Sequence, residues 1–299
     1  MNWLLIAIIA HFLFAVVFII DKYLLSSTKT APVTYAFYTG LLGIFALFLI
    51  PFDFSLMPKD QIILSFLAGI LFNFAILFFY KAIQLGHISR IAPVVGAALP
   101  IFTLALAFLF LGERLGINQL IAFLLLVIGG LIMLWPRRTK TNLPSLAKRL
   151  TPALIAALLF AVSFVLTKFI FNSQSLINSL IWIRFGGILG AFLFLVWPAN
   201  WSVVFKTSKI VSFKLGGLFI SNKALSALST ILISYAIYLG SVTLVNALQG
   251  VQYILLLGAT VFISREFPQF IKEPTNRGVI IKKSVAILFI AIGLSILAL

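Results

Sequence analysis

The sequence predicts an all-α polytopic membrane protein whose ten transmembrane helices form two inverted five-helix repeats. The first observation is composition: 63% of the 299 residues are hydrophobic and 9% are charged, which leaves too few polar side chains to cover a soluble globule. The second is the length of the apolar segments. About 20 residues span a hydrocarbon core of about 30 Å, and such runs are too long for the alternating strands of a membrane barrel. The third is an internal repeat.

Glycine, proline, asparagine and charged residues divide the chain into apolar segments. The first segment is expected to stay in the membrane, since it lacks the basic start and the cleavage site of a signal peptide. The ten predicted spans cover about residues 3–22, 33–51, 61–82, 88–111, 117–135, 152–171, 175–197, 213–239, 242–263 and 281–298.

The repeat is seen first in two eleven-residue stretches. FAVVFIIDKYL, which begins at Phe14, and FAVSFVLTKFI, which begins at Phe160, are identical at five positions. Later pairs are Gly86 with Gly240, Gly96 with Gly250 and Glu113 with Glu266. Since five is odd, the second copy enters the membrane from the opposite side, as in many secondary transporters. The predicted units are residues 1–136, a basic connecting loop at 137–151, and residues 152–299.

The net charge of +16 does not indicate nucleic-acid binding here, because the basic residues lie mainly at span ends, where they orient a protein in the membrane. If the N-terminus is outside, 17 of the 22 Lys and Arg residues lie in or beside cytoplasmic loops. We therefore expect a multi-pass protein of the cell (cytoplasmic) membrane with both termini outside. The chain has no cysteine, and no metal site or cofactor is expected.

The stretch from Ala82 to Leu134 resembles a known family. It reads A-x-x-x-G-x-x-S-x-x-A-P, then Pro100, then FLFLGERLGINQLIAFLLLVIGGLIML, and it is similar to the fourth and fifth helices of EamA-type transporters of the drug/metabolite transporter superfamily. Arg184 in WIRFGGILG looks like an arginine that these proteins often carry. The resemblance implies a carrier of small metabolites, often an exporter, with a central cavity between its halves. It also implies cytoplasmic termini, against the charge count.

Two cations lie within predicted spans, Arg184 and Lys223. The acidic residues all fall at or near span ends, so neither cation is expected to have a carboxylate partner. An embedded cation without a fixed anion suits an anionic or zwitterionic ligand and argues against an exporter of cationic drugs. The alternatives are that Arg184 bonds backbone carbonyls and that Lys223 extends its amine to the interface.

Further polar residues could line a binding site. Asn222, Ser226 and Thr230 recur every four residues on one helix face, although small hydroxyls also join membrane helices. The predicted substrate-binding set is completed by Asn246, Gln249 and Tyr253 in the ninth span, and by Tyr38, Asn73 and Tyr80 in the first half.

Other residues are candidates for conformational change. Pro93, Pro100, Gly96 and Gly250 could serve as hinges, and Glu113 and Glu266 could be gates or helix caps. His11 could take up a proton during transport, the alternative being a neutral histidine bonded to a neighbouring helix.

These observations predict a secondary active transporter that exports amino acids or related carboxylate-bearing compounds by alternating access around a central cavity. No phosphate-binding motif for ATP is present, so a gradient of protons or another ion would supply the energy. The alternatives are a flippase for a lipid-linked headgroup, a multidrug exporter on the same fold and, less favoured, a non-transporting membrane scaffold. An enzyme is not expected, because no embedded acid, histidine cluster or cysteine is available. The expected partners are the substrate and membrane lipid.

Overall fold

The computed structural model describes residues 2–28, 30–85, 88–134, 146–207, 213–252, 254 and 277–298. Within these ranges the fold is all-helical and contains no strand. The helices are α1 (Asn2–Thr28), α2 (Pro32–Leu41), the 3₁₀ segment η1 (Leu42–Leu49), α3 (Lys59–Leu85), α4 (Ile88–Leu111), α5 (Ile117–Leu134), α6 (Leu146–Phe171), α7 (Leu176–Leu193), η2 (Phe194–Val196), α8 (Pro198–Thr207), α9 (Phe213–Leu239), α10 (Val242–Ala247) and α12 (Arg277–Ala298).

Seven helical segments of the described chain are long and apolar enough to cross a membrane: Asn2–Asp21, Pro32–Leu49, Lys59–Leu85, Val94–Leu111, Leu150–Phe171, Leu176–Val196 and Lys214–Leu239. They correspond to predicted spans one to four and six to eight. Predicted spans five and ten are shorter apolar helices, Ile117–Ile132 and Ser284–Leu297. Of the ninth, residues 242–252 and 254 are described, and the rest lies outside the described residues. The chain is thus an integral membrane protein with multiple helices, and the count of ten stays a prediction.

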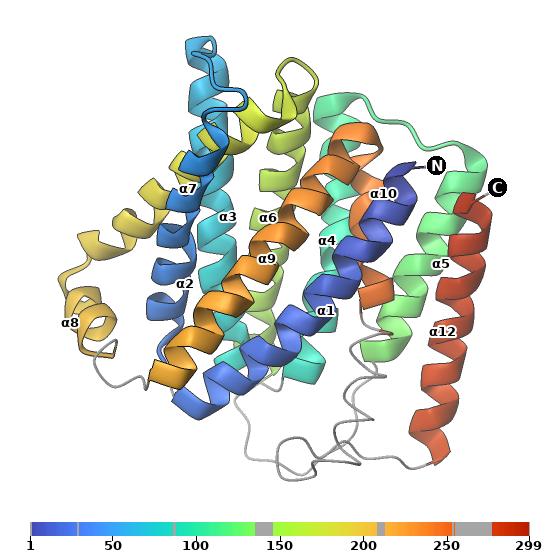
Figure 1. The fold of residues 1–299 in the computed structure, drawn as a ribbon. Helices are drawn as coiled ribbons and strands as arrows, with labels where there is room; N and C mark the ends of the chain where they lie inside the picture. Colours follow the sequence, from blue (N-terminus) through green and yellow to red (C-terminus); the bar gives the residue numbers. More distant parts are fainter. Residues whose placement is uncertain are drawn as a thin grey trace.

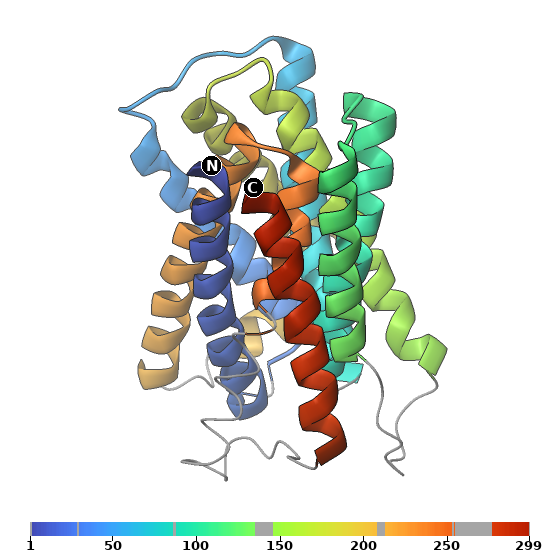
Figure 2. The ribbon, with the colours of Figure 1, turned by 90° about the vertical axis from the view of Figure 1, so that its right-hand side faces the viewer.

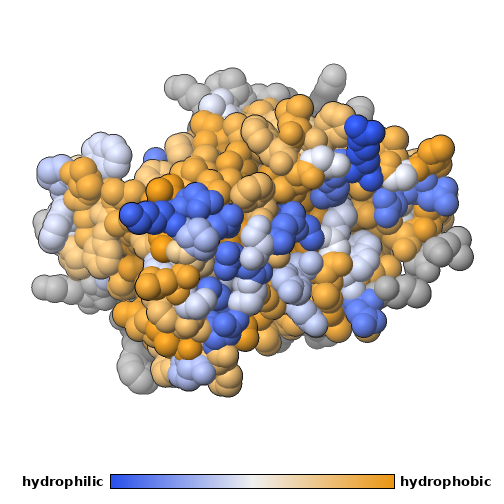
Figure 3. All heavy atoms as spheres, turned by 90° about the horizontal axis from the view of Figure 1, so that it is seen from above, coloured by the Kyte–Doolittle hydropathy of each residue, from blue (hydrophilic) through white to orange (hydrophobic). Residues whose placement is uncertain are grey.

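The long helices stand side by side as a bundle, and both termini lie at the same end of it (Figures 1 and 2). α1 packs along α9, α3 packs along α6 and α7, and α5 packs along α12 at the edge. Seen from the end that carries the termini, polar residues form a band across the middle and apolar residues fill most of the rim (Figure 3). This distribution suits a bundle surrounded by lipid.

Glycines let the backbones of α3 and α7 touch. A Cβ atom at Gly186 would lie 2.6 Å from the Cα atom of Phe66, and one at Gly69 would lie 2.5 Å from the backbone nitrogen of Gly187. Asn73, predicted to bind substrate, lies in the same contact: its Nδ2 donates to the Gly187 carbonyl at 3.1 Å, and its side chain fills the space beside Gly40. In this conformation Asn73 therefore joins α2, α3 and α7.

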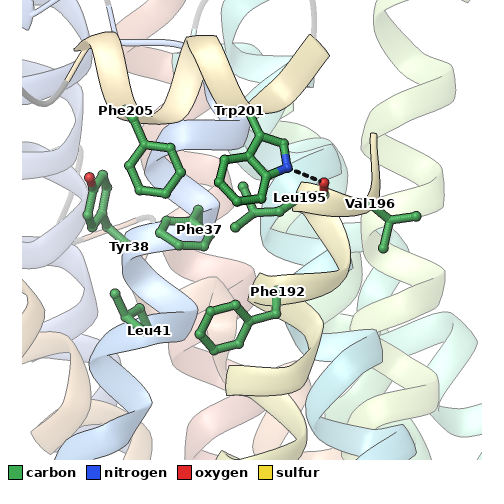
Figure 4. A pocket seen from close by; sticks show the side chains of 8 residues that line it. All are labelled: Phe37, Tyr38, Leu41, Phe192, Leu195, Val196, Trp201 and Phe205. Atoms are coloured by element: carbon green, nitrogen blue, oxygen red, sulfur yellow. Dashed lines mark hydrogen bonds between the residues drawn. The ribbon is translucent and has the colours of Figure 1, made fainter. Parts of the chain in front are cut away.

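A short helix was missed by the sequence analysis. α8 follows the seventh predicted span, and Trp201 and Phe205 on it face Phe37 and Tyr38 of α2 across an apolar groove (Figure 4). The Trp201 indole anchors α8 by donating to the Leu195 carbonyl at 2.7 Å. Tyr38, predicted to bind substrate, thus lies in a groove on the outside of the bundle.

The hinge candidates differ in their surroundings. Pro100 and Gly96 lie inside α4, which continues through both as one helix, and Pro93 is in the same helix. α4 ends at Gly112, whose φ of +65° favours glycine, and the Glu113 amide then donates to the Ala107 carbonyl. The ninth span is interrupted by a turn at Leu248, two residues before Gly250. An interruption is therefore present beside Gly250 and not at Pro100.

Candidate functional site

A cluster of polar side chains is buried where α1, α2, α3 and α9 meet. Its centre is the carboxylate of Asp21, which is 3% exposed. The Lys223 ammonium lies 3.1 Å from one carboxylate oxygen, and the Asn222 amide donates to the same oxygen at 2.6 Å. Tyr80 donates its hydroxyl to the other oxygen at 2.9 Å, and the Tyr35 hydroxyl also donates to Asp21. We call these five residues the Asp21 centre.

The Asp21 centre overturns the expectation that Lys223 has no carboxylate partner. Asp21 was assigned to a span end, but α1 continues to Thr28, so Asp21 lies about 10 Å before the helix end at 1.5 Å per residue. Lys223 lies inside α9 and is 7% exposed, with its ammonium turned to Asp21. Both side chains are buried, and the pairing joins residues that are far apart in the sequence.

Charge balance explains why this centre is stable in the interior. A lone buried charge is costly, but an ion pair whose remaining atoms are hydrogen-bonded offsets its own desolvation. Four donors occupy the two oxygens of Asp21. The Lys223 ammonium also lies 4.4 Å from the centre of the Tyr35 ring and 5.5 Å from that of Phe219, which adds cation–π attraction. One polar atom is left over: Asn222 Oδ1 is buried without a hydrogen-bond partner.

Arg184 is placed elsewhere. It is on α7, half-buried, with its guanidinium 5.9 Å from the centre of the Phe72 ring. The described residues offer it no carboxylate, since the one ion pair among them is Asp21–Lys223. Phe72 and Tyr80 are eight residues apart on α3, or about 12 Å along the helix. The two cations predicted to bind substrate therefore occupy separate places.

The remaining predicted binding residues do not join the Asp21 centre. Ser226 and Thr230 are half-buried on α9, and the Thr230 hydroxyl donates to the Ser226 carbonyl within its own helix. Asn246 is buried and donates to Thr103 of α4 at 3.2 Å. Gln249 has a buried Oε1 without a partner, and Tyr253 lies outside the described residues.

His11 is buried between α1 and the ninth span. Its Nε2 lies 3.1 Å from the Val245 carbonyl and its Nδ1 lies 3.3 Å from the Gln252 side chain. Both partner atoms, Gln252 Oε1 and the Val245 oxygen, are acceptors, and a neutral imidazole has one N–H with which to donate to one of them. These contacts suit the alternative of a histidine bonded to a neighbouring helix, and proton uptake stays a prediction.

At the end of the bundle nearer the termini, Lys168 of α6 caps α9. Its ammonium donates to the carbonyls of Ile237 and Gly240, both at 2.8 Å, and of Tyr238 at 3.3 Å. Glu113 lies nearby and accepts a hydrogen bond from Ser241, the N-cap of α10. Glu113 is thus positioned as the predicted cap or gate, whereas Glu266 lies outside the described residues.

Replacing Lys168 by glutamine should lower the free energy of unfolding by about 1–2 kcal/mol, because a cation at a helix C-terminus satisfies carbonyls and opposes the helix dipole. Thermal unfolding of the purified protein measures the loss. Lys214→Gln on exposed surface is the matched control. Equal stability of the two variants would contradict the capping role.

Two findings relate the chain to known proteins. Residues 1–135 match the model of the EamA-like transporter family. A solved crystal structure of another protein superposes with a TM-score of 0.68 at 15% identity, covering 100% of this chain and 98% of that chain. The comparison with curated proteins found no match.

The structural likeness establishes the fold alone, but it does so for the whole length, including the residues after 135. The family match contains the stretch from Ala82 to Leu134 from which the resemblance was predicted, so that prediction is confirmed. Over residues 1–135, the chain is similar to the EamA-like transporter family.

Proposed function

We propose that the protein is a secondary transporter of small carboxylate-bearing metabolites, amino acids above all, and that it exports them. The observation that carries the proposal is the Asp21 centre. It brings a buried cation, two hydroxyls and an amide, all suited to a carboxylate, to a place where helices of both predicted repeats meet. Such groups are costly within a membrane unless they are paired or serve a function.

Alternating access is supported by how the helices pack. If the repeats are exchanged, α1 corresponds to α6 and α9 corresponds to α3. The contact between α1 and α9 therefore has a counterpart in the contact between α6 and α3, and the helices of each pair pack along their length. The family match also ends at residue 135, beside the predicted repeat boundary. An inverted repeat that rocks about such pairs is a common transporter mechanism.

A second candidate is a multidrug exporter of cationic compounds. The sequence argument against it was the lack of an embedded carboxylate, and Asp21 removes that argument because it is buried at the centre of the polar cluster. Asp21 could bind a cation only after Lys223 moves away from it. A substrate carboxylate can likewise bind Lys223 only after Asp21 is displaced, so the transport assay below distinguishes the two candidates.

Exchange transport in proteoliposomes tests the proposal. Vesicles loaded with unlabelled amino acids should take up the same labelled amino acid several times faster than protein-free vesicles, since exchange needs no added gradient. Lys223→Met should abolish uptake, and Lys214→Gln should leave it unchanged. Uptake of cationic dyes alone would favour the multidrug exporter.

A further inference from the structure

The Asp21 centre is electrically neutral and closed. Its five side chains are each at most 7% exposed, and the Asp21 oxygens have all their donors from within the protein. A ligand can reach Lys223 only by replacing Asp21 as its partner. Whether the buried charge of Asp21 is paired again after this replacement decides which ligands can bind.

Three kinds of ligand have different consequences for this charge. A simple carboxylate that takes over Lys223 leaves Asp21 as an uncompensated buried anion, and a simple amine that takes over Asp21 leaves Lys223 as an uncompensated buried cation. Either state costs several kcal/mol. A zwitterion that enters between them makes two ion pairs in place of one, and the centre stays neutral. Arg184 does not compensate Asp21, because it lies on α7 beside Phe72, and Phe72 is about 12 Å along α3 from Tyr80 of the Asp21 centre.

The polar atoms fit such an insertion. An incoming ammonium has two acceptors side by side, because Asn222 donates to Asp21 at 2.6 Å through Nδ2 while its Oδ1 is buried without a partner. An incoming carboxylate has the Lys223 ammonium, with the Tyr80 hydroxyl 3.3 Å from it. The ring of Tyr35, 4.4 Å from the ammonium, continues to attract Lys223 after it leaves Asp21.

We propose that the Asp21–Lys223 pair is a charge filter that admits ligands of zero net charge carrying an ammonium and a carboxylate. The ammonium binds Asp21 and Asn222 Oδ1, and the carboxylate binds Lys223. The inference rests on the proposed function, since it assumes that substrate reaches this centre. It deepens that function by assigning Asp21 to the amine and by excluding plain organic anions.

Three small ligands test the filter: free alanine, propionate, which lacks the amine, and ethylamine, which lacks the carboxylate. All are small, so side-chain size does not exclude them. Binding to the purified protein is measured by thermal shift, because a ligand of the folded state raises its apparent stability. The unmodified protein should bind alanine at least about a hundredfold more tightly than either analogue, as expected for an unpaired buried charge.

Single substitutions should change the preference. Asp21→Asn leaves Lys223 unpaired and should make propionate the preferred ligand, whereas Lys223→Gln should make ethylamine preferred. The double variant Asp21→Asn/Lys223→Gln is the matched control and should prefer neither. If a single variant does not fold, the relative binding of alanine, propionate and ethylamine to the unmodified protein still tests the inference. Equal binding of propionate and alanine there, an unchanged preference in the variants, or no binding of any ligand would overturn the inference.

Exchange transport separates this failure from failure of the proposed function. Amino-acid exchange without the predicted ligand preferences would leave the protein a transporter and remove the filter. The ligand preferences without amino-acid exchange would establish the filter and contradict the transport proposal.

Discussion

Gly186→Ala should lower the free energy of unfolding by about 1–3 kcal/mol, the usual cost of overpacking a tight interior. The new methyl group would lie 2.6 Å from the Cα atom and 2.8 Å from the carbonyl carbon of Phe66. These are backbone atoms of α3, and they cannot move aside as the end of a flexible side chain does. The two helices must separate, and the Asn73–Gly187 hydrogen bond would be strained with them.

The neighbouring glycine supplies the control. At Gly187 the nearest atom to an added Cβ is the Gly69 carbonyl oxygen, at 3.8 Å, an ordinary contact. Gly187→Ala should therefore keep or slightly raise stability, because alanine favours a helix over glycine by about 1 kcal/mol. Thermal unfolding in one detergent compares the two variants. Similar unfolding temperatures would show that the α3–α7 contact is looser than described.

Breaking the Asp21–Lys223 pair should have the largest effect on stability. Asp21→Asn and Lys223→Met each leave one buried charge without its partner, and such single removals cost about 3–5 kcal/mol. The double variant leaves no charge and should recover most of that loss, since apolar or neutral replacements of a whole buried pair are often well tolerated. Transport should be absent in all three variants.

The double-mutant cycle measures this coupling directly. Unfolding of the four proteins should give an interaction energy above about 1 kcal/mol. Strictly additive losses would mean that the two charges do not depend on each other. Lys168→Gln combined with Asp21→Asn is an independent comparison, because Lys168 caps the other end of α9, and these two losses should add.

The membrane class and most helices could be predicted from the sequence, because the length and polarity of a span follow directly from the bilayer. α1 shows where this fails. Asp21 and the residues after it indicate the end of a span, but the helix continues to Thr28, since a single charged residue lowers helix propensity only slightly. α8 was missed because a ten-residue helix is shorter than any span.

The binding residues were harder to predict than the helices. Asn222, Lys223 and Tyr80 were selected as costly polar groups, and the structure brings them together. Their partner Asp21 could have been found by asking which carboxylate could compensate Lys223, but choosing among six acidic residues requires knowing which helices touch. Tyr35 rather than Tyr38 belongs to the centre because residues three apart differ in facing by about 60° on a helix, and no sequence signal separates them.

The cap on α9 gives that helix the properties of a lever. Lys168 donates to three carbonyl groups at the C-terminal end of α9. Lys223 lies sixteen residues before the last residue of α9, Leu239, or about 24 Å along the helix. If α9 tilted by about 10° about this fixed end, Lys223 would move about 4 Å away from Asp21. That displacement is enough to break the hydrogen bonds that Asn222 and Lys223 make to Asp21, while the three bonds at the fulcrum stay intact.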